Sequence, residues 1–213
     1  MTDQNLTWIV FLLDRSGSMQ SIKSDTEGGF AAFIAEQHTA TGQCAVTLAQ
    51  FDDDYEVVYS GLPVSEVPAL NMAPRGTTAL LDAMGRLITD TGQKLSALPE
   101  DKRPGSVVVA IMTDGMENAS HEWTHSTIKS LVEQQTKDYG WQFLYMGADQ
   151  DAIEVGARLG VSRDHAVTYS RGNADAVMGA SSANLAAFRD ARLASPTASM
   201  PGYTEEQRSS AGE

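Results

Sequence analysis

Three apolar runs divide the chain into segments of similar design. They are WIVFLL at residues 8–13, SVVVAIM at residues 106–112 and WQFLYM at residues 141–146. A strand of a parallel sheet is covered by helices on both faces, so its side chains are apolar at consecutive positions and not only at alternate ones. Each run is followed by a polar or glycine-containing turn and then by a segment with helical spacing. The pattern therefore predicts three strands that are buried on both faces.

A hairpin and several helices complete the predicted set of elements. The runs CAVTLAQF and EVVYSG are separated only by Asp52, Asp53 and Asp54, which indicates a hairpin whose second strand is antiparallel to its neighbour. We read these aspartates as a solvated turn in preference to a calcium site. The remaining predicted elements are a helix from about Leu80, a short helix between Asp151 and Gly160, a strand at residues 166–170 and a long helix from Asn173 to about Leu193.

Alternating strands and helices predict an α/β fold: a doubly wound, mostly parallel central sheet with one antiparallel edge strand. We expect one domain at residues 1–194, followed by a flexible tail at residues 195–213 that contains Pro, Ser and Gly and few residues that could pack. In such sheets, ligands bind at the carboxyl ends of the strands where the strand order reverses. The residues just after the first and fourth strands are therefore the first candidates for a site.

Composition and charge restrict the partners and the compartment. The chain is 42% hydrophobic and 20% charged, as expected of a globular protein. Its net charge of -13 argues against nucleic acid or an anionic membrane as the main partner. The single Cys44 excludes a disulfide framework and indicates a buried thiol. Since residues 8–13 are also too short for a signal-peptide core or a membrane span, we expect a cytoplasmic protein.

Oxygen-bearing side chains follow the first strand. In DRSGSM, residues 14–19, Asp14, Ser16 and Ser18 alternate along a turn. The small Gly17 lets the backbone fold so that one carboxylate and two hydroxyls can converge. A site built only from oxygen ligands favours a hard divalent cation, Mg²⁺ or Mn²⁺ before Zn²⁺.

Two further turns extend this set of donors. TDG after the fourth strand places Asp114 where it could face the first loop, and GTTAL presents Thr77 and Thr78 at the mouth of a helix. In this order and spacing, DRSGSM, GTTAL and TDG resemble the von Willebrand factor type A (VWA) domain with its metal ion-dependent adhesion site (MIDAS). The resemblance spans roughly residues 6–190. Outside the three turns, the stretches TDGMENAS and FLYMGADQDAIEVGARLG are similar to standalone bacterial members of the family.

The resemblance implies a role for particular residues. The implied metal-site residues are Asp14, Ser16, Ser18, Thr78 and Asp114, with Mg²⁺ or Mn²⁺ as the ion. Thr77 stays open as an alternative to Thr78, because the family's turn usually reads Gly-Gly-Thr where this chain has Gly-Thr-Thr. Five protein oxygens leave at least one position of an octahedral ion for an outside ligand. In the family that ligand is typically an Asp or Glu of a partner protein, so the implied function is binding and not catalysis.

The stretch HEWTH, which begins at His121, fits the HExxH pattern of zinc metallopeptidases. A zinc site of that kind needs both histidines on one face in the middle of a helix. Here apolar periodicity begins only at Ile128, and Thr124 is a good N-cap with Trp123 and Ile128 at the positions of a hydrophobic staple. We therefore expect the helix to start inside the motif, which separates His121 from His125. Zinc peptidase activity and hydrolysis by a metal-activated water remain the alternative functions.

A few residues are assigned by position alone. Met116, Glu117 and Asn118 follow Asp114 and Gly115, so we expect them to be exposed beside the ion and to contribute to specificity. Asp149 lies beyond the third apolar run, where it could help to shape the same surface. The basic side chains near the predicted site that could hold an anion are Arg15 and Arg75.

Overall fold

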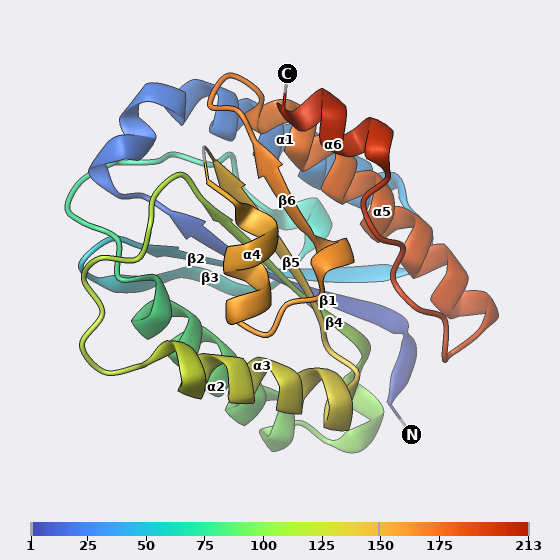
Figure 1. Cartoon of the computed structure of the whole chain (residues 1–213). Helices are drawn as coiled ribbons and strands as arrows, with labels where there is room; N and C mark the ends of the chain where they lie inside the picture. Colours follow the sequence, from blue (N-terminus) through green and yellow to red (C-terminus); the bar gives the residue numbers. More distant parts are fainter. Residues whose placement is uncertain (1, 149, 213) are drawn as a thin grey trace.

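A six-stranded sheet forms the centre of the molecule in the computed structural model, which describes residues 2–148 and 150–212 (Figure 1). Asp149, and with it the surface role expected of that residue, lies outside the described residues. The strands are β1 (Asp3–Asp14), β2 (Gln43–Phe51), β3 (Tyr55–Pro63), β4 (Pro104–Thr113), β5 (Gln142–Ala148) and β6 (Ala166–Tyr169). Their order is β3-β2-β1-β4-β5-β6, and every neighbouring pair is parallel except β2 and β3. The predicted doubly wound sheet with one antiparallel edge strand is confirmed.

Helices cover both faces of the sheet (Figure 1). They are α1 (Lys23–Thr39), α2 (Leu80–Ala97), α3 (His125–Tyr139), α4 (Ala152–Arg158), α5 (Ala174–Ala194) and α6 (Glu205–Gly212). Short 3-10 turns are η1 (Gly17–Ile22), η2 (Val64–Glu66), η3 (Glu100–Lys102) and η4 (Arg163–His165). One layer contains α1, α5 and α6, and the other contains α2, α3 and α4. Among the residues that the structure describes, no helix has the length and apolarity needed to cross a membrane.

The middle strand β1 explains why the apolar run is unbroken. Ile9, Phe11 and Leu13 lie in the core between the sheet and the layer of α1 and α5. Val10 and Leu12 lie in the core on the opposite face, with α2 and α3. All of these side chains are fully buried, because successive side chains of a strand point to opposite faces and both faces are covered.

The segment after α5 corrects the prediction of a flexible tail. Met200, Tyr203 and Ala211 are buried in the same core cluster as α5. The Tyr203 hydroxyl lies 2.6 Å from Ser181 Oγ, and the Arg208 guanidinium lies 5.7 Å from the centroid of the Tyr203 ring. The prediction was wrong because a few apolar residues, widely spaced among polar ones, give no periodic signal in the sequence.

Tyr203 provides a test of this packing. We expect Tyr203→Ala to lower the free energy of unfolding by about 3 kcal/mol, because it removes a buried ring and leaves a cavity. Tyr203→Phe keeps the ring and loses only the contact with Ser181, so it should cost about 1 kcal/mol. Equilibrium denaturation in urea measures both values. A change below about 0.5 kcal/mol for the alanine variant would mean that the segment contributes nothing to stability.

Candidate metal centre

The candidate site lies where the strand order of the sheet reverses. Strands β1 and β4 are parallel neighbours at the centre of the sheet. The chain continues from β1 to β2, toward one edge of the sheet, and from β4 to β5, toward the other edge. β1 ends at Asp14 and β4 ends at Thr113, directly before Asp114. The Thr113 hydroxyl donates to Asp14 Oδ2 over 2.6 Å, which ties the two strand ends together. Ligands of open α/β sheets bind at such a point.

Asp14 is the most deeply buried of the candidate ligands. Its side chain is closed off from solvent, and Oδ1 accepts a hydrogen bond of 2.6 Å from the Ser16 amide. The pKa of Asp14 is raised to about 6: burial is the largest cause, the hydrogen bonds from Thr113 and Ser16 act in the opposite direction, and the neighbouring Asp114 carboxylate adds a smaller increase. A cation beside Asp14 would favour its ionised form.

The hydroxyls converge on the same place as the two carboxylates. Ser16 Oγ and Ser18 Oγ are 3.1 Å apart, and Ser18 Oγ donates to Asp114 Oδ1 over 2.6 Å. A Cβ added to Gly115 would lie 3.1 Å from Thr78 Oγ1 and 3.8 Å from Ser18 Oγ, so these hydroxyls lie around the space that the glycine leaves open. The structure thus brings all five predicted residues together. Two carboxylates and three hydroxyls form an oxygen donor set that fits Mg²⁺ or Mn²⁺.

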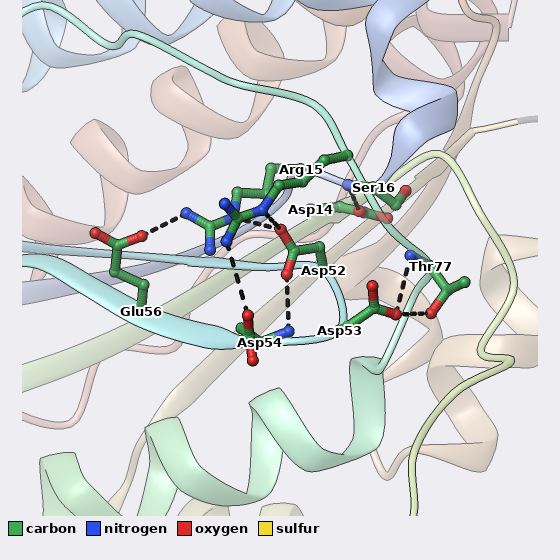
Figure 2. A network of polar contacts seen from close by, with 9 residues as sticks. Asp14, Arg15, Ser16, Asp52, Asp53, Asp54, Glu56 and Thr77 are labelled. Carbon is green, nitrogen blue, oxygen red and sulfur yellow. Dashed lines mark hydrogen bonds and ion pairs between the residues drawn. The ribbon is translucent and has the colours of Figure 1, made fainter.

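The geometry favours Thr78 over Thr77 as the donor. The amide and the hydroxyl of Thr77 both donate to Asp53 Oδ1, on the side of the β2–β3 hairpin (Figure 2). Thr78 is buried, and its amide donates to Asn118 Oδ1 over 3.0 Å. The Thr78 hydroxyl lies beside Gly115, the residue that follows Asp114.

An ion-pair network centred on the buried Asp52 fixes the hairpin against the site (Figure 2). Asp52 is 1% exposed and accepts from Arg15 Nε over 2.9 Å and from Arg75 Nε over 2.7 Å. Arg15 also pairs with Glu56, and Arg75 with Asp54. Burial raises the pKa of Asp52, but the Asp54 amide and the two guanidinium groups outweigh it and hold the pKa below its ordinary value.

This network corrects two expectations. Asp52 is a buried anchor and not part of a solvated turn. Arg15 and Arg75 are engaged with hairpin carboxylates, so they do not face the candidate site as anion-binding groups. Backbone hydrogen bonds join the same two loops: the Arg75 amide donates to the Arg15 carbonyl over 2.8 Å, and the Gly17 amide donates to the Gly76 carbonyl over 3.2 Å.

The residues that follow Asp114 divide into two roles. Glu117 accepts from the Leu81 amide over 2.9 Å, which satisfies a donor that the start of α2 would otherwise leave without a partner. Asn118 holds the amide of Thr78. Both residues thus position the loop before α2. Asn118 is exposed as expected, whereas Glu117 is only partly exposed. Met116, two residues after Asp114, is 72% exposed.

HEWTH is a helix start, as predicted. α3 begins at His125, and the Thr124 side chain caps it. The loop before it is held by Asp82, whose carboxylate accepts the amides of residues 121–123 over 2.8 to 2.9 Å. The two histidines therefore do not share a helical face. Within residues 2–148 and 150–212, no group of three or more His, Cys, Asp or Glu side chains is placed to hold a metal ion.

Comparison with known proteins agrees on the fold. No family model matches the sequence, and no curated protein matches it. Among solved structures, a von Willebrand factor type A protein from Catenulispora acidiphila matches with a TM-score of 0.51 and 16% identity over 84% of this chain and 42% of that chain. Proximal thread matrix protein 1 of the mussel byssus, with a zinc-occupied MIDAS motif, matches with a TM-score of 0.58 and 16% identity over 86% and 48%.

A third match covers almost the whole of the other chain. It is the vWF domain of the type V pili tip protein Mfa5 from Porphyromonas gingivalis, with a TM-score of 0.59 and 10% identity over 84% of this chain and 94% of that one. This chain spans less than half the length of the other two proteins. At these identities the likeness establishes a VWA-like α/β fold.

The contribution of the Asp82 carboxylate to the free energy of unfolding should depend on pH. Burial raises its pKa, but the three amides of residues 121–123 outweigh this effect and lower the pKa below its ordinary value. The stabilisation that Asp82 provides is therefore complete above the unfolded-state pKa, about 3.9, and is lost as the pH falls through the folded-state value. We expect Asp82→Ala to cost about 2 kcal/mol at pH 7 and less at about pH 3.

Urea denaturation at the two pH values measures this difference. Asp90→Ala is the matched control, because Asp90 is an exposed acidic residue on the same helix. A cost for Asp82→Ala that stays constant between the two pH values would contradict the assigned role of the carboxylate.

Proposed function

We propose that this chain is a divalent-metal-dependent protein-binding module. Mg²⁺ or Mn²⁺ would be held by Asp14, Ser16, Ser18, Thr78 and Asp114, and would take a carboxylate from a partner protein as an outside ligand. The observation that carries the proposal is the convergence of two carboxylates and three hydroxyls at the point where the strand order reverses.

Each donor is held in place before any ion arrives. Asp14 is fixed by the Thr113 hydroxyl and the Ser16 amide, and Thr78 by Asn118. Donors that are already ordered lose little conformational entropy on binding, which favours affinity. When bound, the ion would supply a concentrated positive charge with an open coordination position.

The outside ligand would approach from solvent past Ser18. Ser18 is exposed, whereas Asp14, Ser16 and Thr78 are buried. Met116 is exposed two residues after Asp114 and would offer an apolar contact beside the polar one. A directional metal–carboxylate bond beside an apolar side chain suits reversible recognition of a protein surface.

The nature of the similar proteins supports this class of function. One is a matrix protein of the mussel byssus and another is a pilus tip protein. For this chain we propose a partner that presents an Asp or Glu, with neither nucleic acid nor a membrane as the main ligand. We also propose a cytoplasmic location, because a single buried Cys44 suits a reducing compartment.

Calorimetric titration of metal-stripped protein tests the proposal. Mg²⁺, Mn²⁺ and Zn²⁺ are titrated into the wild type, Asp14→Ala and the double variant His121→Ala, His125→Ala. We expect Mg²⁺ or Mn²⁺ to bind the wild type and the histidine variant alike, and Asp14→Ala to lower the affinity by at least about 100-fold.

The variants are more informative than the choice of metal. Zinc occupies the MIDAS of the byssus protein, so zinc binding alone does not indicate a peptidase site. Loss of zinc binding in the histidine variant, with Asp14→Ala unaffected, would instead identify HEWTH as the metal site and refute the proposal.

Gly115 provides a second test that leaves every ligand in place. A Cβ at this position would lie 3.1 Å from Thr78 Oγ1, so Gly115→Ala should displace the hydroxyl by a few tenths of an ångström. We expect Mn²⁺ affinity to fall by about tenfold. Gly28→Ala is the control, because a Cβ at residue 28 has no neighbour within 4 Å. Equal Mn²⁺ affinities for the two variants would place the ion away from Gly115.

A further inference from the structure

Arg171 places a positive charge against the candidate metal site. Its Nε lies 3.8 Å from Asp114 Oδ2. The Asp114 side chain is fully buried, whereas that of Arg171 is 47% exposed. The guanidinium therefore extends from the solvent side of the loop after β6 to a carboxylate of the candidate site.

The C-terminal helix fixes the loop that carries Arg171. The Ser170 amide donates to the Ala211 carbonyl over 2.9 Å, and Ser170 Oγ donates to the Gly212 carbonyl over 2.7 Å. Within the loop, the Asn173 amide donates to the Ser170 carbonyl over 2.8 Å. The last carbonyls of α6 thus hold the backbone next to Arg171, so its charge stays close to Asp114.

Other cations near the site are directed elsewhere. Arg15 and Arg75 pair with Asp52, and their remaining contacts are with Glu56 and Asp54 of the hairpin. Both guanidinium groups thus pair with carboxylates of the hairpin segment. Arg171 is different because its carboxylate contact is a proposed metal ligand.

The charge balance of the loaded site follows from this arrangement. Asp14 and Asp114, both ionised, would cancel the charge of a divalent ion. Arg171 adds a positive charge beside this pair of carboxylates, on a chain whose overall charge is -13. A local positive potential attracts an anionic group even where the rest of the surface repels it.

We propose that Arg171 determines the specificity of the site: it weakens the binding of the cation and strengthens the binding of a carboxylate to the loaded site. This inference rests on the proposed function. It assigns the preference for an acidic partner to a residue outside the metal ligands.

The first measurement is a calorimetric Mn²⁺ titration of Arg171→Gln. We expect its Mn²⁺ affinity to be about fivefold higher than that of the wild type, or about 1 kcal/mol at 1.4 kcal/mol per tenfold change. Arg171→Lys keeps the charge and should stay close to the wild type. Arg158→Gln makes the same change in net charge at an exposed residue that pairs with Glu154, and should leave Mn²⁺ affinity unchanged.

The second measurement uses acetate as the carboxylate probe. Acetate that enters the coordination shell displaces water from bound Mn²⁺, which lowers the relaxation rate of water protons. We expect Arg171→Gln to require about fivefold more acetate than the wild type for the same decrease, and the difference should shrink at high salt. Arg171→Lys and Arg158→Gln should respond like the wild type.

Two results would overturn the inference and separate it from the proposed function. If the wild type binds Mn²⁺ and Arg171→Gln matches it in both measurements, Arg171 has no part in specificity while the metal site stands. An equal shift in Arg158→Gln would likewise attribute the effect to net charge alone. If the wild type binds neither Mn²⁺ nor Mg²⁺, the proposed function and this inference both fail.

Discussion

The burial of the Asp14 carboxylate is the constraint on which the rest of the site depends. Asp14 ends the central strand β1, where apolar layers cover both faces of the sheet. A carboxylate in such surroundings loses its hydration and needs hydrogen bonds and positive charge in return. The Thr113 hydroxyl and the Ser16 amide supply the hydrogen bonds. Asp114 adds a second negative charge close by, and this pair of carboxylates is the basis of the proposed metal site.

A surrounding layer of polar contacts holds the donors at fixed positions. Asp52 joins the hairpin to the DRSGSM loop through Arg15 and to the loop before α2 through Arg75. Glu117 and Asp82 join the start of α2 to the loop before α3. Each loop around the candidate centre is therefore anchored by a neighbouring loop as well as by its own strand or helix. Such mutual anchoring keeps a site in order on segments that would otherwise be the most mobile parts of the fold.

Patterns that are local in the sequence predicted much of this architecture. Burial on both faces produced the consecutive apolar residues of the central strands, and the turn after each strand carried its own polar signature. Contacts between distant segments left no such signal. Neither the anchoring role of Asp82 nor the ion pair of Arg171 with Asp114 can be read from spacing. The choice between Thr77 and Thr78 was equally hidden, because it depends on Asp53, which lies 24 residues before Thr77.

The DRSGSM loop serves two parts of the molecule at once. Asp14 and Ser16 turn toward the candidate centre, while Arg15 between them turns toward Asp52 of the hairpin (Figure 2). Arg75 reaches the same carboxylate from a third segment. In evolutionary terms, residues 15, 52 and 75 should be substituted together. A lineage that replaces one of these charges can retain the loop only by exchanging the others as well.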